Sequence, residues 1–191
     1  MSLLVIISSP SGGGKDSVIN ALLKRIPNST RLITTTTRPK RPGNVDGKDY
    51  YFISKEDFLK KIAAGDFLEH NFYAENYYGS EKKHLAEAEK KYALVLTQIE
   101  VNGKHNLDKA GTPHLAIFLL PESLEELGNR IRRRGGLTPE LIKKRLAIAK
   151  QEIKASTDYD YRIVNAEGKL GETIDKIAEI IDEHLKTEAN P

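Results

Sequence analysis

A short apolar run followed directly by a glycine-rich loop sets the strongest limit on how this chain can fold. Residues 3–7, Leu-Leu-Val-Ile-Ile, have the uninterrupted apolar character of a strand that is buried on both faces of a parallel sheet. A glycine-rich loop leads from there to Lys15, and apolar residues then recur at helical spacing as far as Ile26, just before Pro27. This order of strand, loop and helix predicts an α/β fold with a parallel sheet.

The loop has the composition of a phosphate-binding loop. The general pattern is G-x-x-x-x-G-K-[ST], and this chain keeps the last glycine and the lysine but has Ser9 at the first glycine and Asp16 at the hydroxyl position. Glycines let backbone N–H groups surround an anion, the helix N-terminus adds partial positive charge, and Lys15 adds a full charge. We therefore expect the loop to hold a polyphosphate, and a flexible turn between strand and helix is the alternative.

The rest of the chain continues the alternation of strands and helices. Buried strands are expected at 93–99, 114–120 and 161–164, and helices at 123–133, 138–154 and 172–185. Ser123 with Glu126 has the pattern of a capping box, and Thr138 precedes a first-turn proline. A length of 191 residues favours one core with subdomains over two independent domains.

Between residues 31 and 80 the residue composition of the sequence changes. β-Branched and aromatic residues there are interrupted by proline and glycine, and a short helix is expected at 54–64. This region predicts a small, mostly β insertion in the α/β fold.

Composition excludes several classes of protein. The net charge is only +3, which disfavours a general nucleic-acid-binding surface. The sequence has no cysteine, so disulfides and thiolate metal sites are ruled out, and residues 3–7 are too short for a signal-peptide core or a membrane span. We expect a cytoplasmic protein with no nucleic-acid or membrane partner, and its oligomeric state cannot be predicted.

Several longer stretches resemble, in order, the segments of the guanylate kinase family, which moves a phosphoryl group from ATP to GMP. They are TTTTRPKRPGNVDGKDYYF, FLEHNFYAENYYGS, RIRRRGG, IKKRL and RIVNAE. The resemblance implies one guanylate kinase-like domain over 1–191, a P-loop kinase whose parallel sheet is flanked by helices. It divides the chain into a core (1–33, 81–123 and 159–191), a small, mostly β GMP-binding insertion (34–80) and a helical lid (124–158).

The resemblance also implies which residues bind GMP. The GMP phosphate would be held by Thr34, Arg38, Arg41, Tyr50 and Tyr78. Guanidinium groups pair with phosphate oxygens through two parallel hydrogen bonds, and phenol groups add further donors. For isolated residues, ordinary strand tyrosines and solvated arginines would be the simpler interpretation, but the flanking prolines favour a rigid basic hairpin.

Three further residues are implied for the guanine base. Glu69 matches the family carboxylate that reads the guanine edge, and Ser80 is a second polar contact. A carboxylate accepts hydrogen bonds from both N1–H and the 2-amino group of guanine, a donor pair that adenine lacks. Glu100 stands where the family usually has Asp, and a solvated acid at a strand end is its alternative interpretation. A preference between GMP and dGMP cannot be predicted.

On the ATP side, the resemblance implies a binding set and a catalytic set. The ATP-binding set is Ser11, Gly12, Gly13, Gly14, Lys15, Asp16, Ser17 and Asn165, and the catalytic set is Lys15, Arg41, Arg130, Arg134 and Arg145. Phosphoryl transfer requires alignment of the nucleotides and neutralisation of charge, which arginines carried on a mobile lid can supply. A nucleic-acid patch is the alternative for RIRRRGG, and the low net charge disfavours it.

Asp16 departs from the family pattern. The family has a hydroxyl after the loop lysine and usually an aspartate at the position of Gln98, so the carboxylate is exchanged between the two positions here. We expect Mg²⁺ to arrive with ATP, and our hypothesis is that Asp16 approaches it directly or through water, with Ser17 as the neighbouring hydroxyl. The alternative is that Asp16 caps the helix and repels ATP.

Two other functions fit part of the sequence. Guanylate kinase-like modules of scaffold proteins have lost the phosphate-transfer residues, whereas this chain keeps the loop and the lid arginines. Ribose 1,5-bisphosphate phosphokinase also has GKDS in its loop and VNG after the strand, but it lacks the arginine-rich GMP hairpin. A guanylate kinase is therefore the first hypothesis, the sugar-phosphate kinase the second and the scaffold module the third.

Overall fold

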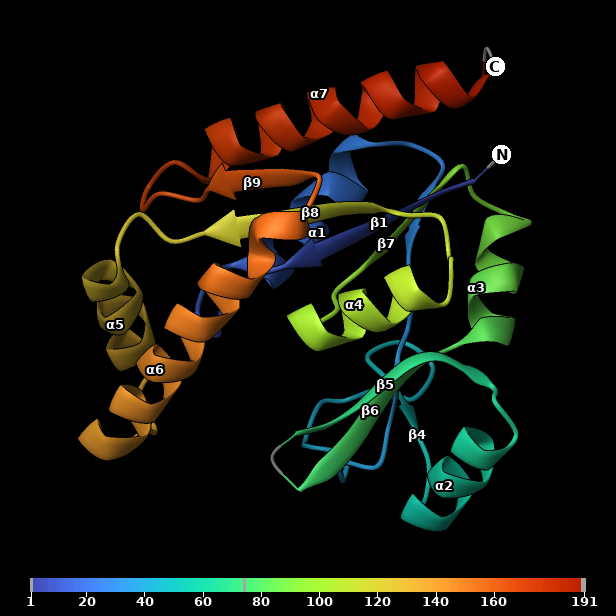
Figure 1. The fold of residues 1–191 in the computed structure, drawn as a ribbon, viewed down its shortest axis with the longest axis horizontal. Coiled ribbons are helices and arrows are strands. Elements are labelled where there is room, and N and C mark those ends of the chain that lie inside the picture. The colour runs from blue at the N-terminus through green and yellow to red at the C-terminus, as the bar shows by residue number, and fades with distance from the viewer. Residues whose placement is uncertain (1, 74, 190–191) are drawn as a thin grey trace.

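A five-stranded parallel sheet forms the centre of the molecule, in the order β2-β7-β1-β8-β9 (Figure 1). The computed structural model describes residues 2–73 and 75–189. The strands are β1 (Leu3–Ser8), β2 (Ser29–Arg31), β7 (Leu94–Thr97), β8 (Leu115–Leu120) and β9 (Tyr161–Val164). The first apolar run thus becomes the middle strand, which pairs with β7 on one side and β8 on the other.

Helices cover both faces of this sheet, which explains the continuous apolar character of β1. These helices are α1 (Lys15–Arg25), α3 (Lys82–Glu89), α4 (Val101–Lys109) and α7 (Leu170–Ala189). Leu3, Val5 and Ile7 pack with apolar residues of α1 and α7. Leu4 and Ile6 point to the opposite face, where they pack with apolar residues of α3 and α4. Successive residues of a strand point to opposite faces, so a strand covered on both sides must be apolar throughout.

A second, smaller sheet carries the insertion that the sequence predicts to be mostly β. Its order is β4-β3-β6-β5, with β3 (Thr35–Thr36), β4 (Tyr51–Phe52), β5 (Phe67–Tyr73) and β6 (Asn76–Glu81). Helix α2 (Lys55–Ala63) packs beside it, and the buried Phe58 ring stacks on Phe67 with centroids 4.4 Å apart. Ser54 caps this helix by accepting a hydrogen bond from the Asp57 N–H over 3.0 Å.

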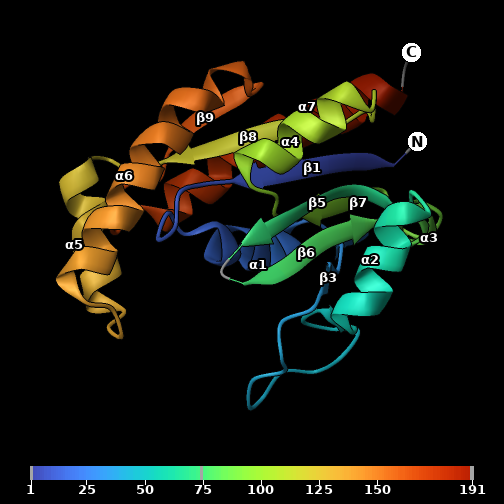
Figure 2. The ribbon, with the colours of Figure 1, turned by 60° about the horizontal axis from the view of Figure 1, so that its bottom comes forward.

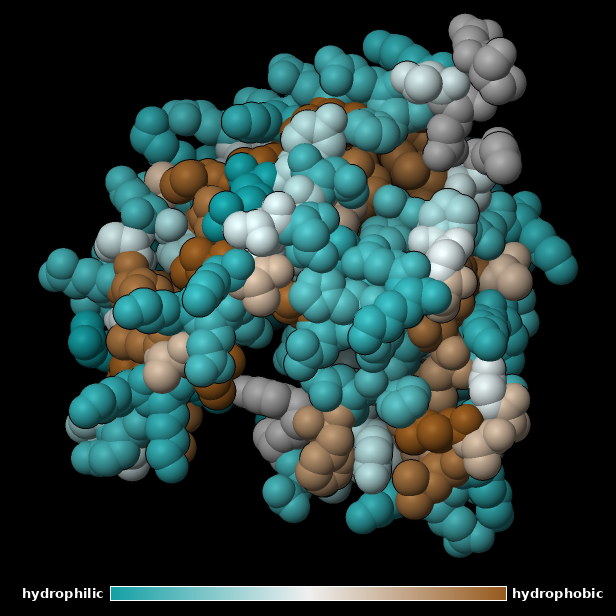
Figure 3. Space-filling model, in the orientation of Figure 1, coloured by the Kyte–Doolittle hydropathy of each residue, from teal (hydrophilic) through white to brown (hydrophobic). Residues whose placement is uncertain are grey.

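Two packed helices project from the other side of the core, as Figures 1 and 2 show. Helix α5 (Leu124–Arg133) packs on α6 (Pro139–Ala155), which continues into the short 3₁₀ helix η1 (Ser156–Asp158). The predicted caps are present: Ser123 Oγ accepts from Glu126 N over 3.0 Å, and Thr138 Oγ1 accepts from Leu141 N over 3.4 Å. Figure 3 shows a hollow between this helical pair and the smaller sheet.

Three elements of the core have no clear signal in the sequence. Strand β2 has only three residues, all of them half-exposed, so no periodicity of buried residues marks it. Helices α3 and α4 are eight and nine residues long and rich in polar side chains. In the described part of the chain, no helix is long and apolar enough to cross a membrane.

Candidate active site

The glycine loop turns sharply between β1 and α1. Gly14 caps the helix with φ of 92°, a left-handed conformation that glycine adopts at little cost. Gly13 is constrained by space, because a Cβ atom built on it would lie 2.6 Å from the Cβ of Ser9. The loop therefore needs glycine at both positions, and Lys15 follows as the first residue of the helix.

Asn165, expected at the ATP site, supports the loop from behind. Its side-chain nitrogen donates to the Gly13 carbonyl oxygen over 2.9 Å, and its side-chain oxygen accepts from Thr173 Oγ1 over 3.1 Å. The residue is buried, so its amide faces protein groups on both sides. Asn165 also borders an open depression that contains Gly12, Gly14, Ser17, Arg130 and Arg134.

A cavity of about 280 Å³ lies between the loop and the smaller sheet, and we call it the central cavity. It is lined by Lys15, Asp16, Thr34, Tyr50, Glu69, Asn71, Tyr78, Gly79, Gln98, Ile99, Glu100 and Gly103. The structure thus brings five of the residues expected to bind GMP into one cavity with the loop lysine.

Glu69 is the most unusual acid of the central cavity, because only 8% of it is exposed. Its Oε1 atom accepts a hydrogen bond from Ser80 Oγ over 2.7 Å. Burial raises the pKa of Glu69 to about 7; the hydrogen bonds from Ser80 oppose this rise, and the charge of Glu100 adds to it. A buried carboxylate that lines a cavity is suited to accept hydrogen bonds from a ligand.

Glu100 lies close to Glu69 and is held by a residue that the sequence did not single out. Asn71 Nδ2 donates to Glu100 Oε2 over 2.7 Å, and both residues line the central cavity. Glu100 precedes α4 but makes no side-chain cap to it, so its carboxylate is directed to Asn71 instead.

The two arginines expected at the GMP phosphate lie outside the lining of the central cavity, as far as the described residues define it. Arg38 Nη2 donates to Asn44 Oδ1 over 3.0 Å, and the guanidinium carbon lies 5.3 Å from the centroid of the Tyr50 ring. Arg41 is exposed, and its backbone N–H donates to the same Asn44 oxygen over 3.1 Å. Both arginines are tied through Asn44 to one short loop beside the cavity.

The three arginines expected on a lid differ in how they reach the loop. Arg145 Nη1 donates to Ser11 Oγ over 3.1 Å, and Arg130 Nη2 donates to the carbonyl oxygen of Asn165 over 2.9 Å. Arg134 is exposed at the end of α5 and borders the same depression as Arg130. Two of the three expected arginines are therefore in contact with the loop or its support.

Sequence reasoning missed Glu152 on helix α6. It lines a second cavity of about 460 Å³, which we call the lid cavity, together with Ser11, Lys15 and Arg145. Burial raises its pKa to about 7, the charge of Glu100 adds to the rise, and Lys15 opposes it. Nothing in the helical sequence around Glu152 distinguishes it from an exposed acid.

Comparisons with known proteins agree with this geometry. A family model described as guanylate kinase matches residues 1–184. A guanylate kinase of Nostoc sp. is 43% identical over 162 residues, which cover 85% of this chain and 81% of the relative. One from Oceanobacillus iheyensis is 40% identical over 187 residues, 97% of this chain and 90% of the relative. The crystal structure of guanylate kinase from Anaplasma phagocytophilum has a TM-score of 0.75 at 32% identity and covers 96% of this chain and 86% of that chain.

Proposed function

This chain belongs to the guanylate kinase family and is an ATP:GMP phosphotransferase, and we propose how its side chains divide the work. One observation carries the proposal: the buried carboxylate of Glu69 and the charged Lys15 line the same cavity. One part of this cavity suits a base that donates hydrogen bonds, and the other suits phosphate groups.

Glu69 would select the guanine base. Its buried carboxylate accepts from N1–H and the 2-amino group, Ser80 orients it, and Glu100 offers a second acceptor nearby. A buried polar site that leaves its own groups unpaired rejects a ligand strongly. AMP would leave Glu69 without its donor pair and would therefore be a poor acceptor.

The acceptor phosphate would bind among Thr34, Tyr50 and Tyr78, which line the cavity. Arg38 and Arg41 would swing in from the adjoining loop and pair with its oxygens. Their two positive charges offset the repulsion that the acceptor phosphate meets from the phosphates of ATP.

ATP would bind along the loop from Ser11 to Ser17, with Lys15 on its terminal phosphates and with Asn165 holding the loop in shape. Arg130, Arg134 and Arg145 would contact the transferring group when the lid closes. The acceptor phosphate oxygen then attacks the terminal phosphorus of ATP, the bond to the leaving ADP oxygen breaks, and GDP and ADP form.

Phosphoryl transfer in this family is ATP-dependent and generally needs Mg²⁺. Within the described residues, no group of three or more His, Cys, Asp or Glu side chains could hold a metal ion. Mg²⁺ is usually bound by one or two carboxylates together with substrate phosphates, and the Asp16 carboxylate beside Lys15 fits that chemistry. We assign Asp16 and the neighbouring Ser17 hydroxyl to this ion, which supplies charge neutralisation at the phosphates when bound.

The decisive experiment is phosphoryl transfer from ATP to a panel of acceptors. GMP and dGMP should be accepted, and AMP, CMP and UMP should react much more slowly. Equal rates with AMP and GMP would refute the role of Glu69. Turnover of ribose 1,5-bisphosphate would favour the sugar-phosphate kinase, and binding of GMP without any turnover would favour the non-catalytic module. We place this reaction in the cytoplasm, which the lack of cysteine suits.

A further inference from the structure

Asp16 poses an electrostatic problem for a phosphate site. It follows Lys15 directly, and both side chains line the central cavity. The Asp16 side chain is 65% exposed, so burial does not keep its carboxylate away from a ligand at Lys15. An uncompensated negative charge there would cancel much of the attraction that Lys15 exerts on phosphates.

The structure supplies a compensating charge from a distant part of the chain. Arg31 Nη2 donates to Asp16 Oδ1 over 2.9 Å, and the Arg31 side chain is only 26% exposed. Arg31 is the last residue of the edge strand β2, which pairs in parallel with β7 and brings Arg31 opposite Leu96. The carboxyl end of this strand therefore lies beside the first turn of α1.

Gln98 joins the pair from the end of β7. With its amide nitrogen facing Asp16, Gln98 donates to Asp16 Oδ1 over 2.9 Å and accepts from Arg31 Nη2 over 2.9 Å. The three side chains then form a closed ring of hydrogen bonds whose net charge is zero. Asp16 Oδ1 is taken up by this ring, and Oδ2 has no part in it.

The charges of Asp16 and Arg31 act in opposite directions on Tyr50, which lines the central cavity. Burial, followed by the charges of Tyr78 and Asp16, raises the pKa of Tyr50, while Arg38 and Arg31 act in the opposite direction. Because Tyr50 lines the cavity, the charges of both Asp16 and Arg31 act on a group that a ligand would contact.

We propose that Arg31 is a positioning residue of the phosphate site: it neutralises Asp16 and, with Gln98, holds its carboxylate so that Lys15 keeps its attraction for the phosphates of ATP. This inference rests on the proposed function, since it takes ATP as the ligand of the loop. Arg31 itself need not touch ATP, because its effect passes through Asp16.

A double-mutant cycle on ATP binding tests the proposal. We would compare the wild type, Arg31→Gln, Asp16→Asn and the double variant by calorimetric titration with ATP in EDTA, where no metal ion can screen Asp16. Arg31→Gln should weaken metal-free ATP binding about tenfold, because it leaves Asp16 unpaired. The double variant should return to within about threefold of the wild type, because it has no charge left to compensate.

The matched control is Arg25→Gln, which removes the same charge at the far end of α1, where Arg25 pairs with Asp175. It should leave ATP binding unchanged, and thermal melting of each variant checks folding. Equal weakening in Arg31→Gln and in the double variant, or no weakening in Arg31→Gln, would overturn the proposal while the proposed function stands. If the wild type binds ATP with Mg²⁺ but not in EDTA, the proposal is overturned and the proposed function stands. If it binds ATP under neither condition, both are refuted.

Discussion

The carboxylate of Glu69 lies so close to Gly103 that a Cβ atom built on this glycine would be 2.8 Å from Oε2. Gly103 belongs to α4, and the same Cβ would lie 2.3 Å from the side chain of Ile99. The depth at which Glu69 sits in the central cavity therefore depends on the absence of a side chain in the first turn of a neighbouring helix.

We predict that Gly103→Ala displaces Glu69 and weakens GMP binding about tenfold, because overpacking a tight site forces its neighbours to move. The measurement is GMP affinity by calorimetry, together with the ratio of GMP to AMP turnover, which should fall. Gly111→Ala is a control for folding, since no atom lies within 4 Å of the corresponding Cβ, although its positive φ costs some stability. Undiminished selectivity in Gly103→Ala would show that Glu69 tolerates the methyl group.

The raised pKa of Glu69 predicts a pH dependence for binding of the base. Glu69 must be ionised to accept two hydrogen bonds, and its pKa is about 7 in the free protein. Guanosine affinity should therefore fall about tenfold from pH 8 to pH 6, with proton release on binding at the lower pH. Guanosine is used in place of GMP because the GMP phosphate itself titrates and would add its own pH dependence. Because Glu152 has a similar pKa, Glu69→Gln is the necessary control, and its guanosine affinity should be nearly independent of pH.

The raised pKa of Glu69 also predicts that the stability of the folded protein falls as pH rises, whereas guanosine binding strengthens. A carboxyl group whose pKa is raised in the folded protein stabilises it at pH below about 4, and this contribution is lost as pH rises through about 7. Glu69→Gln should gain stability relative to the wild type between pH 4 and pH 8, by an amount on the order of 2 kcal/mol. Urea unfolding at both pH values measures it, and a constant difference between the two proteins would contradict the assignment.

The core strand β1 and the two helix caps could be predicted from the sequence because the local residue pattern agrees with the packing of the whole fold. The run from Leu3 to Ile7 is apolar at every position because helices cover both faces of β1. Ser123 and Thr138 cap their helices with bonds that span only three residues, so the sequence pattern is enough to predict them. Five residues of the central cavity, Thr34, Tyr50, Glu69, Tyr78 and Glu100, were expected from family resemblance, which carries information that periodicity lacks.

The parts that could not be predicted depend on long-range packing. Arg31 meets Asp16 only because β2, three residues long, joins the edge of the sheet. Glu152 is half-buried and lines a cavity with Ser11 and Lys15 of the loop, and its helix carries no motif. Arg38 and Arg41 were expected at the GMP phosphate but lie beside the central cavity, since the loop that holds them is tied to Asn44.

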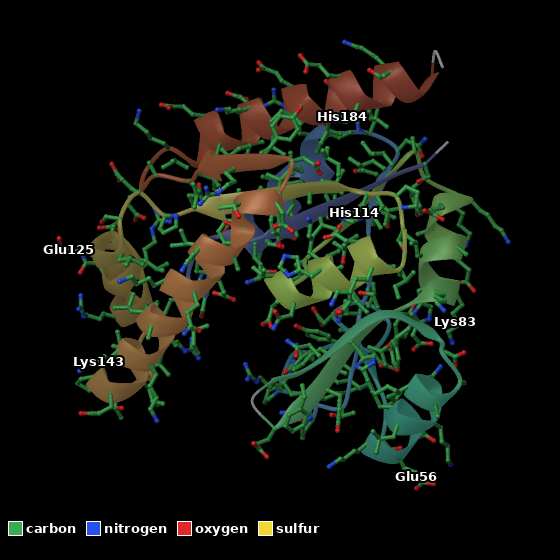
Figure 4. The ribbon with its side chains drawn as sticks, in the orientation of Figure 1. Glu56, Lys83, His114, Glu125, Lys143 and His184 are labelled. Carbon is green, nitrogen blue, oxygen red and sulfur yellow. The ribbon has the colours of Figure 1, made fainter. Side chains whose placement is uncertain are left out.

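We predict that residues 34–80 and 124–158 close toward each other when both nucleotides bind. Phe72 and Ile148 line the lid cavity from opposite sides and are 49% and 46% exposed, so closure would cover two large apolar side chains. Glu56 on α2 and Lys143 on α6 lie in these two segments and are labelled in Figure 4. The chain has no cysteine, so single cysteines can be placed at these two positions and labelled without background.

The distance between labels at Glu56→Cys and Lys143→Cys, measured by pulsed electron paramagnetic resonance, should shorten with GMP and a non-hydrolysable ATP analogue. A second pair at Lys83→Cys and Lys186→Cys lies on α3 and α7 of the core and should keep its distance. An unchanged distance in the first pair with both nucleotides present would contradict the closing of residues 34–80 and 124–158 toward each other.

The last prediction concerns Asp16 as a metal ligand. Arg31→Gln is expected to weaken ATP binding in EDTA, whereas Asp16→Asn is not. Asp16→Asn keeps the size of the side chain but removes the charge that Mg²⁺ prefers in its oxygen ligands. The Mg²⁺ concentration for half-maximal rate should rise about tenfold, since loss of one ligand charge weakens binding of the ion. GMP affinity should change little, because Glu69 binds the base separately. ATP binding in EDTA should stay the same or tighten, since a negative charge beside Lys15 is lost. Ser17→Ala, which removes only the neighbouring hydroxyl, should raise the Mg²⁺ requirement less. If Asp16→Asn keeps the wild-type Mg²⁺ dependence, or reacts faster, Asp16 does not serve the metal and its carboxylate has only Arg31 and Gln98 as partners.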